Sequence, residues 1–286
     1  FSFEHSHTSA SPSHCAVYRR QPAWSSAGTT ASAARAWYTA RDPILGAKAM
    51  LHDDVLSYIL NGQPHPLAAP LAEWLAASRR FAAFADTFRD KIRKKLRAPQ
   101  DEASMLDLRL ELETAFLLLR ERALSLVYEP QQPGGARTPD FAVAFTTSTT
   151  FMAEVTRLRA ATESSAAPPA ERLADTIFGK LGQLLPQRSN VLIVGVEGVA
   201  PPLDELRAAM ARLLQRVEGG DELVLRRHHA RDRAEFFRRY RRLSEVLVRS
   251  LPSHDGAAYA WGNPQAQYSL PGKARAALYR SHSLQA

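Results

Sequence analysis

The sequence has 286 residues, of which 45% are hydrophobic and 23% charged, so it can bury the core of one large or two small domains and is not a wholly disordered chain. No apolar stretch approaches the ~20 residues of a membrane-spanning helix, and the single Cys15 forms neither an internal disulfide nor a zinc cluster, so we expect a cytoplasmic protein without a membrane partner. The net charge of +8 favours a nucleic-acid partner, although GC-rich coding DNA also produces arginine-rich chains.

Residues 1–49 are rich in Ser, Thr, Ala and His and lack an apolar period. They begin with Phe1, and the pattern becomes protein-like only at Met50. We therefore expect 1–49 to be a disordered or non-native leader outside the fold. A mitochondrial presequence is a partial alternative, because such presequences are also rich in Arg and Ser.

Residues 50–98 have the apolar spacing of helices, interrupted at 62–70 by Gly and Pro. The sequence thus predicts a small helical cap. Its last helix carries the basic run Asp90-Lys-Ile-Arg-Lys-Lys-Leu-Arg97. Such a run is either a solvated helix face or a surface that contacts phosphate groups.

Residues 99–220 alternate between helical and strand patterns in a way that predicts an α/β core. The elements expected are a helix over 101–122, strands over 123–128, 141–145 and 151–155, a helix over 171–185, a strand over 190–196 and a helix over 202–217. The three short strands predict an antiparallel meander. The strand–helix–strand sequence that follows predicts a crossover to a parallel strand.

Residues 221–286 predict a basic helical C-terminal extension, with a strand over 222–226 and an amphipathic helix over 231–251. Arg238, Arg239, Arg241 and Arg242 lie off the apolar stripe of that helix. They form either a solvated face or a set of contacts to nucleic-acid phosphates.

A short acidic motif coincides with the predicted core: Glu113 in the first helix, Thr138-Pro-Asp140 before the second strand, and Ala153-Glu-Val-Thr156 in the third. Over 101–217 this pattern resembles the PD-(D/E)XK nuclease superfamily. The resemblance implies a restriction-endonuclease-like mixed sheet with the order α-β-β-β-α-β-α. It also implies DNA cleavage with Mg²⁺ or Mn²⁺, with Glu113, Asp140, Glu154 and a lysine as catalytic residues, and it leaves a homodimer open.

The chemistry of Asp140 and Glu154 supports a metal site. Adjacent strands of a meander bring both acids together within apolar runs, where two carboxylates repel each other and are poorly solvated. A Mg²⁺ ion, which prefers hard oxygen ligands, removes that conflict. In the alternative, Asp140 caps a strand and Glu154 pairs with Arg157 or Arg159.

The motif lysine is replaced by Thr156, which cannot supply positive charge to a phosphate. Lys180 is the candidate substitute, because Leu173, Ile177, Lys180 and Leu184 share one face of the predicted helix. Gln183 lies three residues further along the same helix. In the alternative, Lys180 extends from the edge of the apolar stripe into solvent.

Two acids of the first core helix compete for a place at the site. Glu113 occupies a polar strip between two apolar arcs, whereas Glu111 lies on the broader charged face with Asp107. The enclosed strip favours Glu113. An ordinary helical pair between Arg109 and Glu113 is the alternative.

The leading functional prediction is a Mg²⁺-dependent DNA endonuclease or related phosphodiesterase. A catalytically inactive nuclease fold that binds nucleic acid or a protein partner is the second prediction, and it is favoured by Thr156. A structural or toxin-associated module that uses the helical cap as its interface is the third. The position of Lys180 relative to the two acids discriminates among them.

Overall fold

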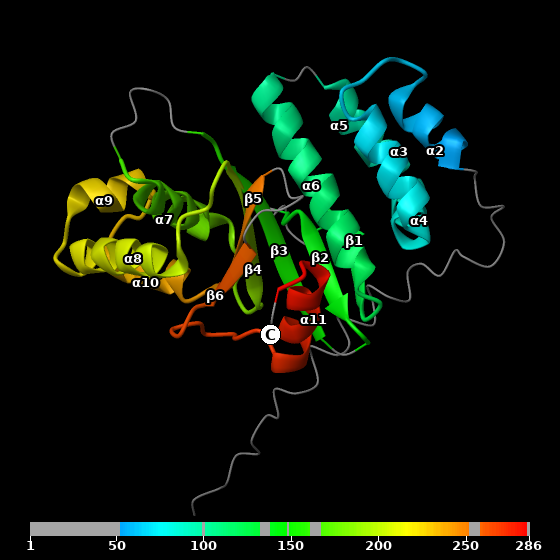
Figure 1. Ribbon diagram of the computed structural model, residues 1–286. Helices are drawn as coiled ribbons and strands as arrows, with labels where there is room; N and C mark the ends of the chain where they lie inside the picture. The colour runs from blue at the N-terminus through cyan, green and yellow to red at the C-terminus, as the bar shows by residue number, and fades with distance from the viewer. Residues whose placement is uncertain are drawn as a thin grey trace, which may run out of the picture. The chain divides into compact units, whose positions relative to one another are not determined.

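The computed structural model describes residues 52–98, 101–131, 138–147, 149–160, 167–251 and 258–284. The predicted leader, residues 1–49, lies outside these residues. The described chain is a mixed α/β protein in which helices cover both faces of one six-stranded sheet (Figure 1). None of the described helices is long and apolar enough to cross a membrane.

The strands follow one another across the sheet in chain order, from β1 to β6. They are β1 (Leu124–Tyr128), β2 (Phe141–Phe145), β3 (Thr149–Leu158), β4 (Asn190–Glu197), β5 (Leu243–Leu251) and β6 (Ala258–Gly262). The first three strands are antiparallel, β3, β4 and β5 are parallel to one another, and β6 is antiparallel to β5. The carboxyl ends of β3, β4 and β5 therefore lie at the same edge of the sheet.

Two groups of helices pack on the two faces of the sheet (Figure 1). The first group is α2 (His52–Leu60), α3 (Ala68–Ala77), α4 (Arg79–Thr87), α5 (Arg89–Arg97), α6 (Glu102–Arg120) and α11 (Gly272–Ser281). The second group is α7 (Pro169–Lys180), α8 (Leu203–Glu218), α9 (Glu222–Arg227) and α10 (Arg233–Tyr240), together with the 3-10 turn η2 (Leu181–Gln183). Each group has its own apolar core against the sheet.

The helical segment predicted for 50–98 and the order of elements predicted for 101–217 are both present. Asp101 caps α6 by accepting a hydrogen bond from the Ser104 backbone N–H at 2.8 Å, as its polar side chain before an apolar period predicts. The strand over 190–196 is buried along nearly its whole length and pairs in parallel with β3. This confirms the predicted crossover.

The helix predicted over 231–251 is wrong, because the chain forms α10 and then the buried strand β5. Two charged residues of β5 make this stretch resemble the polar face of a helix. Both are instead neutralised inside the protein, Glu245 by Arg275 at 2.9 Å and Arg249 by Glu113 at 3.1 Å.

The strand predicted over 222–226 is also wrong, because these residues belong to the short helix α9. The side chain of Asp221 accepts hydrogen bonds from the backbone N–H groups of Leu223 and Val224. That cap gives the segment a helical start despite its β-prone residues. The C-terminal region predicted as a helical extension thus supplies β5 and β6 to the same sheet.

Helix α6 is covered on two sides, by the sheet and by the helices before it. Trp74 of α3 and Phe81 of α4 pack on Phe116 of α6, with ring centroids 5.9 and 5.7 Å away. On the sheet side, a Cβ atom added to Gly195 of β4 would lie 2.8 Å from a methyl carbon of Leu110. Glycine at this position therefore lets α6 approach the sheet closely.

Candidate functional site

A cavity of about 510 Å³ lies where α5 and α6, the β2–β3 pair and the end of α7 meet. Its wall contains Asp140, Glu154 and Lys180, three of the four residues predicted to be catalytic. The wall also contains Thr156, at the position of the missing lysine, and two residues of the other helices, Lys95 and Glu111. Residues from four parts of the sequence thus line one site.

Asp140 directly precedes β2, beside the part of β3 that extends beyond the β2–β3 ladder. The β2–β3 ladder ends at the pair Phe141 and Ala153, although β3 extends to Leu158. Beyond the end of the ladder, β3 has no strand partner on the β2 side among the described residues. There the carboxylate of Asp140 accepts a hydrogen bond from the Val155 backbone N–H at 2.7 Å. The strand-capping alternative for Asp140 is therefore realised, but it uses one carboxylate oxygen and leaves further acceptor positions.

Glu154 reaches the cavity from β3, and Lys180 reaches it from the last turn of α7. The Lys180 Nζ atom lies 3.4 Å from Glu154 Oε1 and 3.1 Å from Gln183 Oε1. The Glu154 side chain is 8% exposed and that of Lys180 is 24% exposed. The lysine thus points inward to an acid of the motif, as its position on the apolar stripe of the helix predicts.

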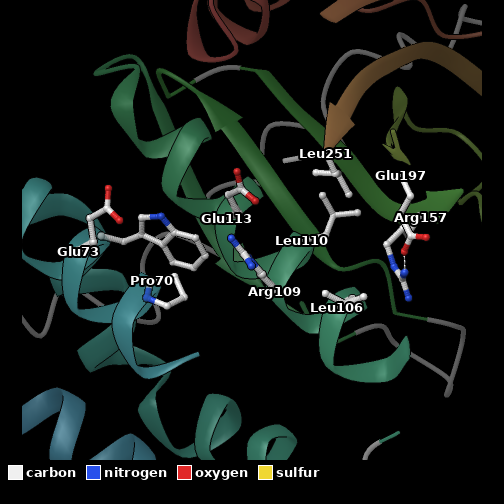
Figure 2. Close-up of a pocket in the computed structure, with 10 residues that line it drawn as sticks. Pro70, Glu73, Leu106, Arg109, Leu110, Glu113, Arg157, Glu197 and Leu251 are labelled. Atoms are coloured by element: carbon white, nitrogen blue, oxygen red, sulfur yellow. Dashed lines mark ion pairs between the residues drawn. The ribbon is translucent and has the colours of Figure 1, made fainter. Parts of the chain in front are cut away.

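The helix acid in this cavity is Glu111, not Glu113. Glu113 lines a second cavity, shown in Figure 2, and its Oε1 atom pairs with Arg249 Nη1 of β5 at 3.1 Å. The prediction placed Glu113 at the site because its strip lies between apolar arcs. This prediction is wrong because α6 is covered on both sides, so Glu111 and Glu113 both face enclosed space.

Lys95 of the cap helix α5 is the main contact of Glu111. Its Nζ atom lies 2.8 and 2.9 Å from the two Glu111 oxygens and 2.8 Å from Glu129 Oε1. This role of Lys95 was not predicted from the sequence. A signal was available, because Lys95 lies beside the buried positions Ile92 and Leu96 on the inner side of α5.

Glu129 follows β1 and has a positive φ of 43°, an uncommon conformation for a residue other than glycine. Its backbone N–H donates to the Asp140 carbonyl oxygen at 2.8 Å. This bond extends the contact between the two chain segments beyond the β1–β2 ladder. Glu129 therefore holds the backbone of Asp140 while its carboxylate holds Lys95.

Burial shifts the pKa values of two acids that line the cavity, Glu111 and Asp140. Burial and, to a smaller extent, the nearby Asp140 carboxylate raise the pKa of Glu111 to about 7, against the opposing effect of Lys95. Burial also raises the pKa of Asp140, while the Val155 N–H, Lys95 and Lys180 counteract that rise. Burial alone would lower the pKa of Lys95, but its two carboxylate partners raise it. The site therefore has buried carboxylates whose negative charge is only partly compensated.

This imbalance predicts a pH effect on stability. Because the pKa of Glu111 is about 7 in the folded state and lower in the unfolded state, the folded state holds an extra proton between about pH 4.5 and 7. The free energy of unfolding should therefore fall as the pH rises through this window, by about 2–3 kcal/mol from Glu111. Urea unfolding at pH 5 and pH 8 should show a smaller fall for Glu111→Gln than for the wild type. An equal fall in the exposed control Glu102→Gln and in Glu111→Gln would contradict this.

The arginines that were the alternative partners of Glu154 have other contacts. Arg157 pairs with Glu197 and, at 2.8 Å, with Asp107, and its side chain is 3% exposed. Arg159 lies 3.7 Å from the same Asp107. Arg157 therefore joins β3 to α6 and β4.

The predicted arginine cluster near α10 divides into two pairs. Arg239 binds Glu235 at 2.7 Å and Arg242 donates to the Leu184 carbonyl oxygen at 3.2 Å, so both serve the structure. Arg238 and Arg241 are exposed. Of the four predicted arginines, these two have no structural contact of this kind within the described part of the chain and extend into solvent.

The donor set of the cavity is made of hard oxygens. Among the described residues, no group of three or more His, Cys, Asp or Glu side chains is arranged to hold a metal ion. Asp140 and Glu154 supply two carboxylates, the number that Mg²⁺ commonly takes from a protein when water and substrate phosphate complete its shell. Burial raises the pKa of Glu111 and Asp140 although Lys95 and Lys180 are close, and a cation at this place would favour their ionised forms.

Comparisons with known proteins give no relative for this chain. No protein-family model matches it, and no curated protein and no solved structure is significantly similar to it. The function of the chain is therefore inferred from the residues of the site.

Proposed function

We propose that the protein is a Mg²⁺-dependent DNA endonuclease of the PD-(D/E)XK type, with a restriction-endonuclease-like core. One observation carries the proposal. Lys180, contributed by the helix after the motif strand, lies 3.4 Å from Glu154 in the cavity that also contains Asp140 and Glu111. A lysine among buried acids supplies the positive charge that Thr156 lacks.

The order of the elements supports the same proposal. A helix with an inward acid, an antiparallel meander with the two motif acids, and a crossover to a parallel strand follow one another from α6 to α8. Each acid lies where this arrangement uses it, because Asp140 directly precedes β2, Glu154 is on β3 and Glu111 is on α6. Agreement between motif and topology is more specific than the motif alone.

Asp140 and Glu154 are the residues that would hold the metal ion. When bound, Mg²⁺ polarises a phosphate group and lowers the pKa of a bound water molecule. Mn²⁺ suits the same oxygen donors. The hydrogen bond from the Val155 N–H fixes the Asp140 carboxylate, which reduces the reorganisation needed when a cation arrives.

Lys180 and Glu111 have distinct roles in the proposed reaction. The Lys180 ammonium, fixed by Gln183, stabilises negative charge that develops on the phosphate oxygens. The Glu111 carboxylate, with a pKa of about 7, can accept a proton near neutral pH, when about half of it is ionised. Lys95 lowers the pKa of Glu111 and thereby keeps it in the range where it can act as a base.

The proposed substrate is DNA, because the chain has a net charge of +8 and exposed arginines outside the site. Arg238 and Arg241 are the proposed contacts to the phosphate backbone. Their contribution does not depend on base sequence, so it should appear as salt-sensitive binding.

The proposal is tested by incubating the wild-type protein with supercoiled plasmid in Mg²⁺, in Mn²⁺ and in EDTA. We expect nicked and linear DNA with either metal and intact plasmid in EDTA. A shifted but uncleaved band with every divalent ion would overturn the endonuclease proposal. That outcome would favour an inactive nuclease fold that binds nucleic acid.

A further inference from the structure

The second cavity, about 370 Å³ in volume, adjoins the proposed active site. Leu110 and Arg157 line both cavities, one from α6 and the other from the end of β3. The far wall is formed by α3, and the floor by the carboxyl ends of the parallel strands β4 and β5 through Glu197 and Leu251 (Figure 2). Carboxyl ends of parallel strands are where open α/β sheets commonly bind ligands.

The lining of this cavity combines a flat aromatic group with apolar walls. Trp74 contributes to the wall, and Phe116 stacks behind it with the ring planes inclined by 21°. Pro70 and Leu106 add apolar surface. This volume is at the lower end of the range for small-molecule pockets, so it suits a ligand the size of a single nucleotide.

The charged groups of the lining differ in how they are satisfied. Glu113 pairs with Arg249, and Glu197 pairs with Arg157. Within the part of the chain that the structure describes, Arg109 has neither a hydrogen bond nor an ion pair. Figure 2 shows it between Glu113 and Leu106 on α6. Its planar group of five donors is therefore available to a ligand.

We propose that this cavity binds one unpaired base of the DNA substrate, next to the phosphate held in the active site, and that Arg109 selects guanine. The inference rests on the proposed function, because the two cavities share a wall. Trp74, of which 7% is exposed, contributes an aromatic edge of the wall that any base can contact. A free phosphate is a poorer candidate, because three carboxylates also line the cavity: Glu73, Glu113 and Glu197.

The choice of guanine follows from the geometry of the guanidinium group. Arginine donates two parallel hydrogen bonds to the O6 and N7 acceptors of guanine, whereas adenine presents a donor at the equivalent place. Lysine retains the positive charge but lacks the planar pair of N–H donors that forms these two parallel hydrogen bonds. Arg109→Lys should therefore keep general attraction to nucleotides and lose the preference among bases.

The test is titration calorimetry of the full chain with guanosine, adenosine, cytidine and thymidine 5′-monophosphates. We expect guanosine monophosphate to bind about ten- to a hundred-fold more tightly than the others, and Arg109→Lys to remove this difference. Arg120→Lys, an exposed arginine at the end of the same helix, is the matched control and should behave as the wild type. Thermal melting verifies that each variant is folded.

Cleavage patterns give a second readout that separates this inference from the proposed function. Sequencing the ends of wild-type cleavage products should show guanine enriched at one position beside the cut, and Arg109→Lys should flatten that enrichment. Cleavage without base enrichment and without guanosine monophosphate binding would overturn the base pocket and leave the nuclease intact. Selective binding of guanosine monophosphate without any cleavage would support the pocket and count against the proposed reaction.

Discussion

Lys180→Met should lower the rate of Mg²⁺-dependent DNA cleavage by about 10²- to 10³-fold, because a positioned ammonium stabilises developing phosphate charge by a few kcal/mol in an enclosed site. The Lys180 side chain is 24% exposed and fixed by Gln183, so little reorganisation is needed when the charge develops. DNA binding should change only a few-fold, since the proposed phosphate contacts, Arg238 and Arg241, lie outside the cavity. Single-turnover cleavage and a filter-binding series in increasing salt measure the two effects separately.

The matched control for this change is Lys94→Met, which removes an exposed lysine from α5, outside the cavity. It should leave the cleavage rate within about two-fold of the wild type. Equal cleavage by Lys180→Met and the wild type would refute the role of Lys180. Equal losses in the two variants would show that the effect comes only from net charge.

Asp140→Asn should abolish the stabilisation of the protein by Mg²⁺. An ion that binds only the folded state at ten times its Kd contributes about 1.4 kcal/mol, which raises the Tm of a chain of this size by about 2–4 °C. Asparagine keeps an oxygen that can accept the Val155 N–H bond but removes the negative charge that attracts the metal. Thermal melting of both proteins with and without Mg²⁺ measures this difference.

The same variant separates metal binding from folding. Because burial raises the pKa of Asp140, its ionised form is costly in the folded state, and Asp140→Asn without metal should melt at or above the wild-type temperature. Asp175→Asn, which removes an acid that does not line the cavity, should retain the Mg²⁺ response. A full Mg²⁺ response in Asp140→Asn would contradict the assignment of this carboxylate as a ligand.

The sequence predicted most of the central elements because each has a simple period and a clear end. The buried strand at 190–196 and the apolar stripe that carries Lys180 needed no knowledge of distant contacts. The inward position of Lys180 followed from helical spacing alone. Local signals are therefore sufficient where one face of an element is buried.

Residues whose environment comes from distant parts of the chain were harder to predict. Glu111 faces Lys95 and Glu113 faces Arg249, a residue 136 positions later, so nothing local distinguishes the two acids. Strand β5 was mistaken for a helix because its buried charges are neutralised by partners elsewhere in the chain. A buried ion pair places charged residues at core positions, which disrupts the apolar spacing from which strands and helices are predicted.

The most direct test of the central claim moves the lysine back to its motif position. Thr156 lines the same cavity as Lys180, so the double variant Thr156→Lys/Lys180→Met should place an ammonium beside the same phosphate from the strand instead of the helix. In single-turnover cleavage with Mg²⁺, we expect the double variant to cleave DNA at least ten-fold faster than Lys180→Met. A folded double variant that stays as inactive as Lys180→Met, beside an active wild type, would contradict the claim that the two positions serve one catalytic site.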